Sequence, residues 1–113
     1  MEARAVQKYI QSSPRKVRLL ADLVRGMNVE QALNTLHFQK KHASLHVAKV
    51  IKSAVANLMV KEDRQINPSE VVVKEIFVNG GTMLKRILPA PMGRAYRIRK
   101  RTCSITVKVA TKR

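Results

Sequence analysis

The sequence has little cysteine, few aromatic residues and no long apolar run. Its 113 residues include one cysteine, no tryptophan, two tyrosines and two phenylalanines. The single Cys103 excludes an internal disulfide framework and a zinc site built from cysteines. No apolar run approaches the ~20 residues that a membrane span needs, and the first ~20 residues lack the apolar region of a signal peptide. We therefore expect a cytoplasmic protein with no membrane partner.

Acidic residues are also scarce, and they are unevenly distributed. Asp and Glu number 7 against 23 Lys and Arg, which gives a net charge of +16. All of the acids lie within residues 1–75, whereas residues 76–113 contain basic residues and no acidic ones. A surface that faces only solvent usually mixes both signs, so a stretch of one sign indicates contact with a polyanion. The charge pattern therefore predicts a nucleic-acid partner, most of all for the last third of the chain.

The sequence shows no group of residues typical of an enzyme active site. His37, His42 and His46 are close in sequence, but no carboxylate or thiol nearby would complete a metal site. Cys103 falls on the apolar face of a predicted strand and has no adjacent histidine or acid, so we expect a buried structural thiol. Paired carboxylates and glycine-rich phosphate loops are missing. We expect no catalytic residue, no metal and no cofactor.

Hydrophobic periodicity predicts a mixture of helices and strands. In chain order we expect a strand over 2–10, a helix from Pro14 to Gly26, a short helix from Val29 to Leu36, a helix over about 41–60, and strands over 70–79 and 102–110. Ser13 before Pro14 is typical of a helix start with a serine cap, and Asn28 has the position of a second cap. Ala54 belongs to the apolar stripe of the third helix, so we expect it to be buried.

Residues 80–101 separate the last two strands and contain only scattered apolar residues. Gly80 and Gly81 open this segment, and a turn-forming run occupies 89–93. The pattern predicts an extended β-hairpin whose tip stands ~30 Å from the body. Its positive charges are candidate RNA contacts: Lys85, Arg86, Arg94, Arg97, Arg99, Lys100 and Arg101.

A second group of candidate contacts lies at the start of the first helix. Arg15, Lys16 and Arg18 follow Pro14 directly, and a helix N-terminus itself attracts phosphate. With only four aromatic residues in the chain, recognition of phosphate and shape in folded RNA is favoured over the stacking of many bases.

Several ordered motifs resemble one known family over nearly the whole chain. They are Ser13–Arg18, Ile51–Asn57, Leu84–Pro89, and the stretch from Gly93 through Arg101-Thr102 to Val107. In this order they resemble the family of the universal large-subunit ribosomal protein number twenty-two. The resemblance implies an α+β fold, with three helices packed on a small three-stranded antiparallel sheet and a long extended β-hairpin. The length allows one domain over 1–113, and we expect a body formed by 1–79 and 102–113 with the basic hairpin over 80–101.

The resemblance further implies a function. A member of this family would be a structural constituent of the large ribosomal subunit that binds its rRNA and supports subunit assembly. Its partners would be that rRNA, neighbouring ribosomal proteins and the nascent peptide, without homo-oligomers. The hairpin tip that would line the peptide exit tunnel maps here to Pro89, Ala90, Pro91, Met92, Gly93, Arg94 and Ala95. The alternative is a DNA-binding architectural protein whose arm enters a minor groove.

Overall fold

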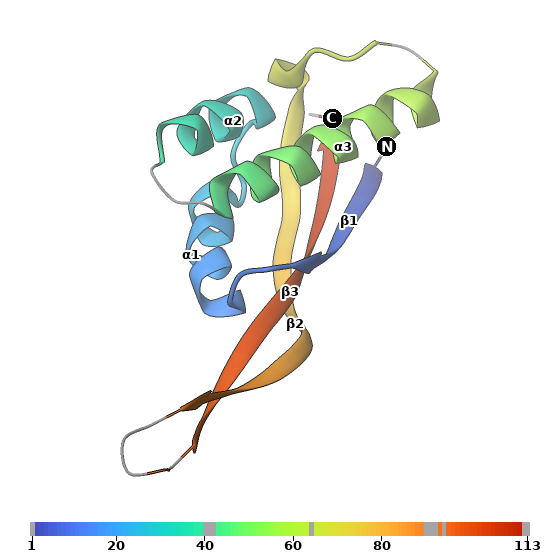
Figure 1. Ribbon diagram of the computed structural model, residues 1–113. Helices are drawn as coiled ribbons and strands as arrows, with labels where there is room; N and C mark the ends of the chain where they lie inside the picture. The colour runs from blue at the N-terminus through green and yellow to red at the C-terminus, as the bar shows by residue number, and fades with distance from the viewer. Residues whose placement is uncertain (1, 40–42, 64, 90–92, 94, 112–113) are drawn as a thin grey trace.

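The protein consists of a small α+β body from which one pair of strands extends (Figure 1). The computed structural model describes residues 2–39, 43–63, 65–89, 93 and 95–111, and for 82, 84–89 and 95–100 it describes the backbone alone. The elements are β1 (Glu2–Ile10), α1 (Pro14–Val24), α2 (Val29–Phe38), α3 (Ala43–Glu62), the 3₁₀ turn η1 (Pro68–Glu70), β2 (Val71–Pro89) and β3 (Ala95–Thr111). The α+β class expected from the sequence is confirmed. The expected first residues of the third helix, 41 and 42, lie outside the described residues.

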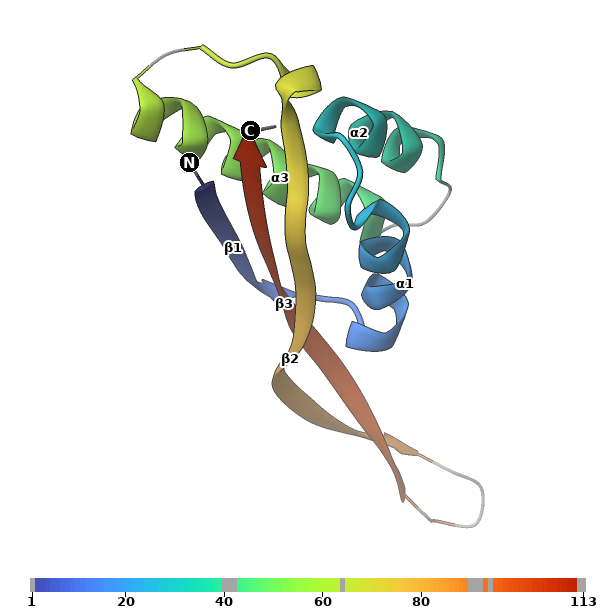
Figure 2. The same ribbon diagram turned by 180° about the vertical axis from the view of Figure 1, so that it is seen from behind.

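The three strands form one antiparallel sheet in the order β1-β3-β2. The last strand is therefore the central one, and Val107 of β3 lies opposite Ala5 of β1 and Ile76 of β2. All three helices lie on the same face of this sheet (Figures 1 and 2). Figure 2 views the molecule from the other side, where the strands lie in front of α3.

The core lies between the sheet and the helices. Alternate residues of β3 point into it, and Cys103, Ile105, Val107 and Val109 are all fully buried, as the alternation predicted. Ala54 of α3 is fully buried as well. Burial raises the pKa of the Cys103 thiol, which therefore stays protonated at neutral pH.

The helix ends follow the signals in the sequence, with one correction. Ser13 occupies the N-cap position of α1 as predicted, but its side chain makes no capping hydrogen bond. At α2 the predicted cap is formed, because Asn28 Oδ1 accepts a hydrogen bond from the Glu30 N–H at 2.9 Å. Gly26 follows the end of α1 with a φ of +80°, a conformation that glycine adopts without steric cost.

Helix α3 combines length with an apolar composition. Of the described helices, only α3 (Ala43–Glu62) is long and apolar enough to span a membrane by these two criteria. One stripe of it, however, packs against β1 and β3 and against the other two helices. Its composition is accounted for by this position, since the core helix of a soluble domain has the same character.

Both edges of the sheet are covered by polar groups from the helices and their connections. At the β1 edge, Asn57 Nδ2 and Lys61 Nζ donate to the carbonyl oxygens of Arg4 and Glu2, each at 2.9 Å. At the β2 edge, the Val73 N–H donates to Met27 O, and the Gly26 N–H donates to Val73 O. These contacts satisfy backbone groups that a free edge strand would leave exposed.

Candidate nucleic-acid interface

Helix α1 begins with two exposed cations. The chain leaves β1 through a tight turn in which the Ser12 N–H donates to Ile10 O at 2.8 Å. Arg15 and Lys16 then form the first turn of the helix, and within the described part of the chain neither makes a hydrogen bond or ion pair. Two unengaged positive side chains therefore stand beside backbone N–H groups that the Ser13 hydroxyl does not cap, an arrangement that suits phosphate.

The third predicted cation of this helix has a different role. The Arg18 guanidinium is exposed, but its Nε donates to the carbonyl oxygen of Val78 in β2 at 3.1 Å. Further along the helix, Arg25 Nη2 donates to Ile76 O at 2.8 Å while its Nη1 pairs with Asp22 at 2.7 Å. The two arginines thus fasten α1 to the edge of β2, so Arg18 serves the fold and has only part of its surface left for a ligand.

The predicted hairpin is present as the outer parts of β2 and β3. The pairing of β1 with β3 ends at Ile10–Cys103, and beyond that level the ladder is two-stranded. It continues from Met83–Arg101 to Pro89–Ala95, and Figure 1 shows it leading away from the helices. The molecule is correspondingly long and narrow, with extents of 63 × 26 × 16 Å.

The hairpin leaves the body at a break in the register. The β2–β3 pairing shifts between Gly80 and Met83. At Gly81 a Cβ atom would lie only 2.7 Å from Thr102 Oγ1, so a side chain at this position would require Thr102 or the local backbone to shift. The glycine thus allows a close approach of the strands at the irregularity, which marks the place where a three-stranded sheet becomes a two-stranded ribbon.

Within the ribbon, the register brings positive residues together. Lys85 lies directly opposite Arg99, a like-charge pair that disfavours an isolated ribbon. Of the other predicted basic residues of the ribbon, the four with a described partner lie opposite uncharged residues, in the pairs Arg86–Ile98, Ile87–Arg97, Leu84–Lys100 and Met83–Arg101. Of the predicted tip, residues 90–92 and Arg94 lie outside the described residues, while Pro89 pairs with Ala95 and Gly93 is exposed.

The fold brings the two predicted cationic regions to the same end of the body. A Cβ at Gly80, where the ribbon begins, would lie 4.0 Å from Cγ of Pro14, the first residue of α1. The hydrogen bond from Arg18 to Val78 O holds the helix at the same level of β2. Residues that are 60 or more positions apart in the sequence thus meet where α1 begins and the ribbon leaves the body.

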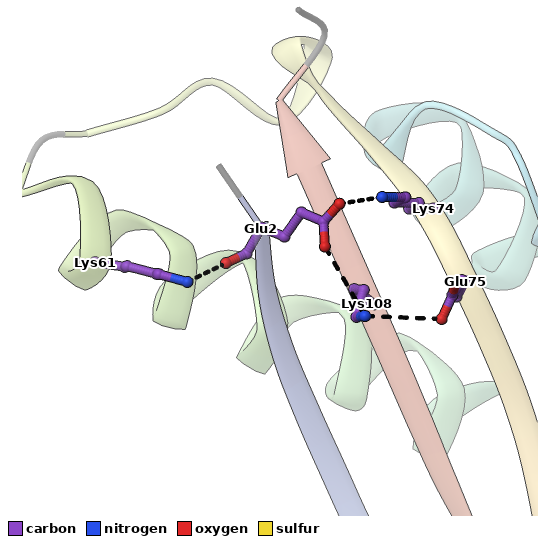
Figure 3. Close-up of polar contacts among 5 residues, drawn as sticks. All are labelled: Glu2, Lys61, Lys74, Glu75 and Lys108. Carbon is purple, nitrogen blue, oxygen red and sulfur yellow. Dashed lines mark hydrogen bonds and ion pairs between the residues drawn. The ribbon is translucent and has the colours of Figure 1, made fainter.

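The opposite end of the sheet has balanced charges. There Glu2 accepts from Lys74, and its other carboxylate oxygen lies 3.9 Å from Lys108 Nζ (Figure 3). Lys108 also lies 3.9 Å from Glu75, which closes a network of two acids and two lysines. The hydrogen bond from Lys74 lowers the pKa of the Glu2 carboxyl, and the same bond raises the pKa of Lys74. The network of Glu2, Lys74, Lys108 and Glu75 and the exposed pair Arg15 and Lys16 therefore lie toward opposite ends of the sheet.

These features define a class of protein, one whose small α+β body carries a long ribbon rich in charges of one sign. Residues 5–110 match the family model described as ribosomal protein L22p/L17e. The large ribosomal subunit protein uL22 of Chlorobaculum tepidum is 52% identical over 110 residues, which cover 96% of this chain and 92% of that protein. The uL22 proteins of Christiangramia forsetii and Bacteroides fragilis are 56% and 48% identical, over 85% and 91% of this chain and 72% and 76% of theirs.

The chain belongs to the ribosomal protein L22p/L17e family. Membership confirms the resemblance found in the sequence, and it confirms that the protein is a structural ribosomal protein and not an enzyme. Among the described residues there is also no group of three His, Cys, Asp or Glu side chains that could hold a metal ion.

Two features of this interface were not predicted from the sequence. The first is the attachment of Arg18 and Arg25 to β2 carbonyl groups, for which a sequence carries no local signal. The second is Tyr9, which has a positive φ of 61° and is 74% exposed at the end of β1. No glycine, proline or asparagine lies within two residues of Tyr9, so only the register in the folded sheet shows its unusual position.

Proposed function

We propose that the protein binds the rRNA of the large ribosomal subunit through the basic surface formed by the start of α1 and the ribbon. In this role it joins rRNA segments during assembly and then remains as a structural constituent beside neighbouring ribosomal proteins. The relatives named above are proteins of the large ribosomal subunit, which favours rRNA over the alternative of DNA.

One observation carries this proposal, namely the separation of paired and unpaired charge. The acids Glu2 and Glu75 neutralise lysines at one end of the sheet. At the other end Arg15 and Lys16 have no such partner in the described chain, and Lys85 is set opposite Arg99. Placing like charges together is unfavourable in water and becomes favourable when phosphates surround them, because binding releases condensed counterions.

The proposal predicts a strong dependence of rRNA affinity on salt. If ~8 phosphates are neutralised, the logarithm of the association constant should fall with the logarithm of salt concentration at a slope of about −6 to −7. The measurement is filter binding or fluorescence anisotropy with large-subunit rRNA over a series of salt concentrations. A flat response would exclude an electrostatic interface.

A matched pair of double variants locates the interface. Arg15→Ala with Lys16→Ala should make the slope less steep by about 2, since each cation that contacts a phosphate accounts for about one unit. Lys49→Ala with Lys52→Ala removes the same charge from exposed positions of α3 and should leave the slope unchanged. Equal changes of slope in the two double variants would show that rRNA affinity depends on the net charge of the protein and not on where the cations lie. A DNA duplex that competes as well as rRNA would support the alternative function.

The second part of the proposal concerns the tip, which we infer lines the peptide exit tunnel and contacts the nascent peptide. The ribbon supports this because the pairs from Met83–Arg101 to Pro89–Ala95 carry the tip ~20 Å beyond the body. A slender two-stranded ribbon can pass between RNA segments where a globular body cannot enter. The family resemblance assigns the same role to residues 89–95.

Cross-linking in assembled subunits tests the position of the tip. The buried, protonated thiol of Cys103 is a poor target, so a single new cysteine can be labelled selectively. A photoreactive group on Ala95→Cys should cross-link to a stalled nascent chain. The same group on Leu45→Cys, at an exposed position of α3, should not. Cross-links from Leu45→Cys alone would overturn the tunnel assignment while leaving the rRNA proposal intact.

A further inference from the structure

Tyr9 occupies a position that its own fold does not explain. Between Gln7–Ile105 and Ile10–Cys103, β1 advances three residues while β3 advances two, so β1 contains one extra residue. Continued alternation from Ala5 would turn Tyr9 toward the core. The bulge reverses the phase, so Ile10 is buried with 2% of its surface exposed while Tyr9 remains 74% exposed.

This arrangement is unfavourable for an isolated body. A φ of 61° is uncommon for an aromatic residue, because its Cβ crowds the backbone in the left-handed region. The ring also gives up the burial that aromatic side chains normally gain. Within the described residues the one aromatic ring pair is His37–Phe38, and Tyr9 makes no hydrogen bond there. A strained, largely exposed ring without a hydrogen bond or an aromatic neighbour among the described residues suggests a partner outside the fold.

The surroundings of Tyr9 indicate the chemistry of that partner. Lys8 beside it is exposed, and the turn at Ser12 leads within a few residues to Arg15 and Lys16. On the other side, Ile10 pairs with Cys103, two residues beyond the exposed Arg101. Tyr9 therefore lies at the level where the ribbon leaves the body, among cations that suit phosphates.

We propose that Tyr9 is a stacking platform for one unpaired nucleobase of the bound rRNA. The phosphates of the same RNA segment would contact Arg15 and Lys16, and the base would turn out of its helix onto the phenol ring. Aromatic side chains bind splayed RNA bases in this way, and such a contact fixes the position of an RNA segment in addition to attracting it. The inference rests on the proposed rRNA binding and adds a contact with a base to a surface otherwise made for phosphate.

A pair of substitutions separates stacking from folding. Tyr9→Asn keeps a residue that tolerates positive φ but removes the ring, so the melting temperature should stay the same or rise. Its rRNA affinity should fall about tenfold, the loss typical of one base stack. Tyr9→Phe keeps the ring and should bind like the wild type, and any loss in it would point to the hydroxyl instead.

The salt series distinguishes this contact from the phosphate contacts. Stacking releases no counterions, so Tyr9→Asn should lower the affinity at every salt concentration without changing the slope. Arg15→Ala with Lys16→Ala should change the slope as described above. If the wild type fails to bind rRNA, the proposed function fails. If the wild type binds and Tyr9→Asn binds equally well, only the stacking proposal is overturned.

Tyrosine fluorescence gives an independent readout. The chain has no tryptophan and two tyrosines, so Tyr96→Phe leaves Tyr9 as the one tyrosine. Its emission should be quenched when rRNA is added to this variant, because a stacked base lies against the ring. Unchanged emission at saturating rRNA would overturn the stacking proposal.

Discussion

The two ends of this sheet use similar residues in opposite ways. At the end near the N-terminus, Lys74 and Lys108 lie beside Glu2 and Glu75, and the network lies on the exposed face of the sheet (Figure 3). At the end where the ribbon begins, Arg15 and Lys16 have no acidic partner within the described residues. The comparison shows that cations at the two ends differ in whether an acid lies beside them, a difference that net charge alone does not reveal.

The largest effect is expected from a substitution that destabilises the folded body, to which both ends of the sheet belong. Ala54 is fully buried in α3, so Ala54→Arg forces a long charged side chain into a packed site without a partner. We expect a loss of several kcal/mol in the free energy of unfolding, enough to abolish or severely weaken folding. Ala56→Arg is the matched control, because the same change falls on the exposed face of the same helix. Thermal melting of both variants is the measurement, and equal midpoints would contradict the assigned core.

An intermediate effect is expected from shortening one arm of the ribbon. Deletion of Leu84, Lys85 and Arg86 removes ~10 Å of strand, and since three is odd it exchanges the faces of the residues beyond it. The body should still fold and enter the subunit through the start of α1, while the tip is displaced and the tunnel changes shape. Reconstituted subunits would show this by incorporation assays and by electron microscopy.

A control deletion keeps the register of the same ribbon. Removing the paired residues 84–85 and 99–100 shortens both arms equally, so the tip should retract without twisting. Loss of incorporation in the three-residue deletion would mean that the ribbon, and not the start of α1, is the main anchor. A tip left in place would contradict the expectation that the length and register of the arm determine where the tip lies.

The smallest effect tests the balanced end of the sheet. The hydrogen bond from Lys74 lowers the pKa of Glu2 below its usual 4.5, so Glu2 stabilises the folded state above that pH. This stabilisation should be lost as the pH falls through the lowered value. Glu2→Gln should therefore melt slightly below the wild type at pH 7, and the two should converge in acid once the pH lies below the lowered pKa of Glu2. The difference should be small because the ion pair is exposed. Glu70→Gln, outside the network, serves as the control, and an equal shift would contradict a specific role for Glu2.

Much of this architecture follows from local patterns in the sequence. The alternation of Cys103, Ile105 and Val107 predicted the buried face of β3, and Pro14 and Gly26 predicted the limits of α1. Such signals are reliable because the repeats of a strand and of a helix involve residues that are close together in the sequence. The one-signed charge of the last third, which is also local, predicted the candidate interface.

The remaining features depend on contacts between distant residues. The hydrogen bond from Arg18 to Val78 O joins residues 60 positions apart, and no local sequence pattern in either segment indicates it. The bulge at Tyr9 could not be predicted either. The sequence of Gln7, Lys8 and Tyr9 does not decide which of these side chains face the core, and only the pairing of Ile10 with Cys103 shows it. The missing hydroxyl cap at Ser13 shows the limit of a motif, since the right residue in the right place does not guarantee its hydrogen bond.

The covered sheet edges have a consequence for the protein before it reaches RNA. A small sheet with open edges can recruit further strands from other copies, and a newly made basic protein at high concentration would be at risk of aggregation. Here Asn57 and Lys61 occupy one border, while Arg25 and Met27 occupy the other. The body therefore offers no free template for strand addition along these stretches. The elements that complete its core thus also occupy backbone groups through which another strand would pair.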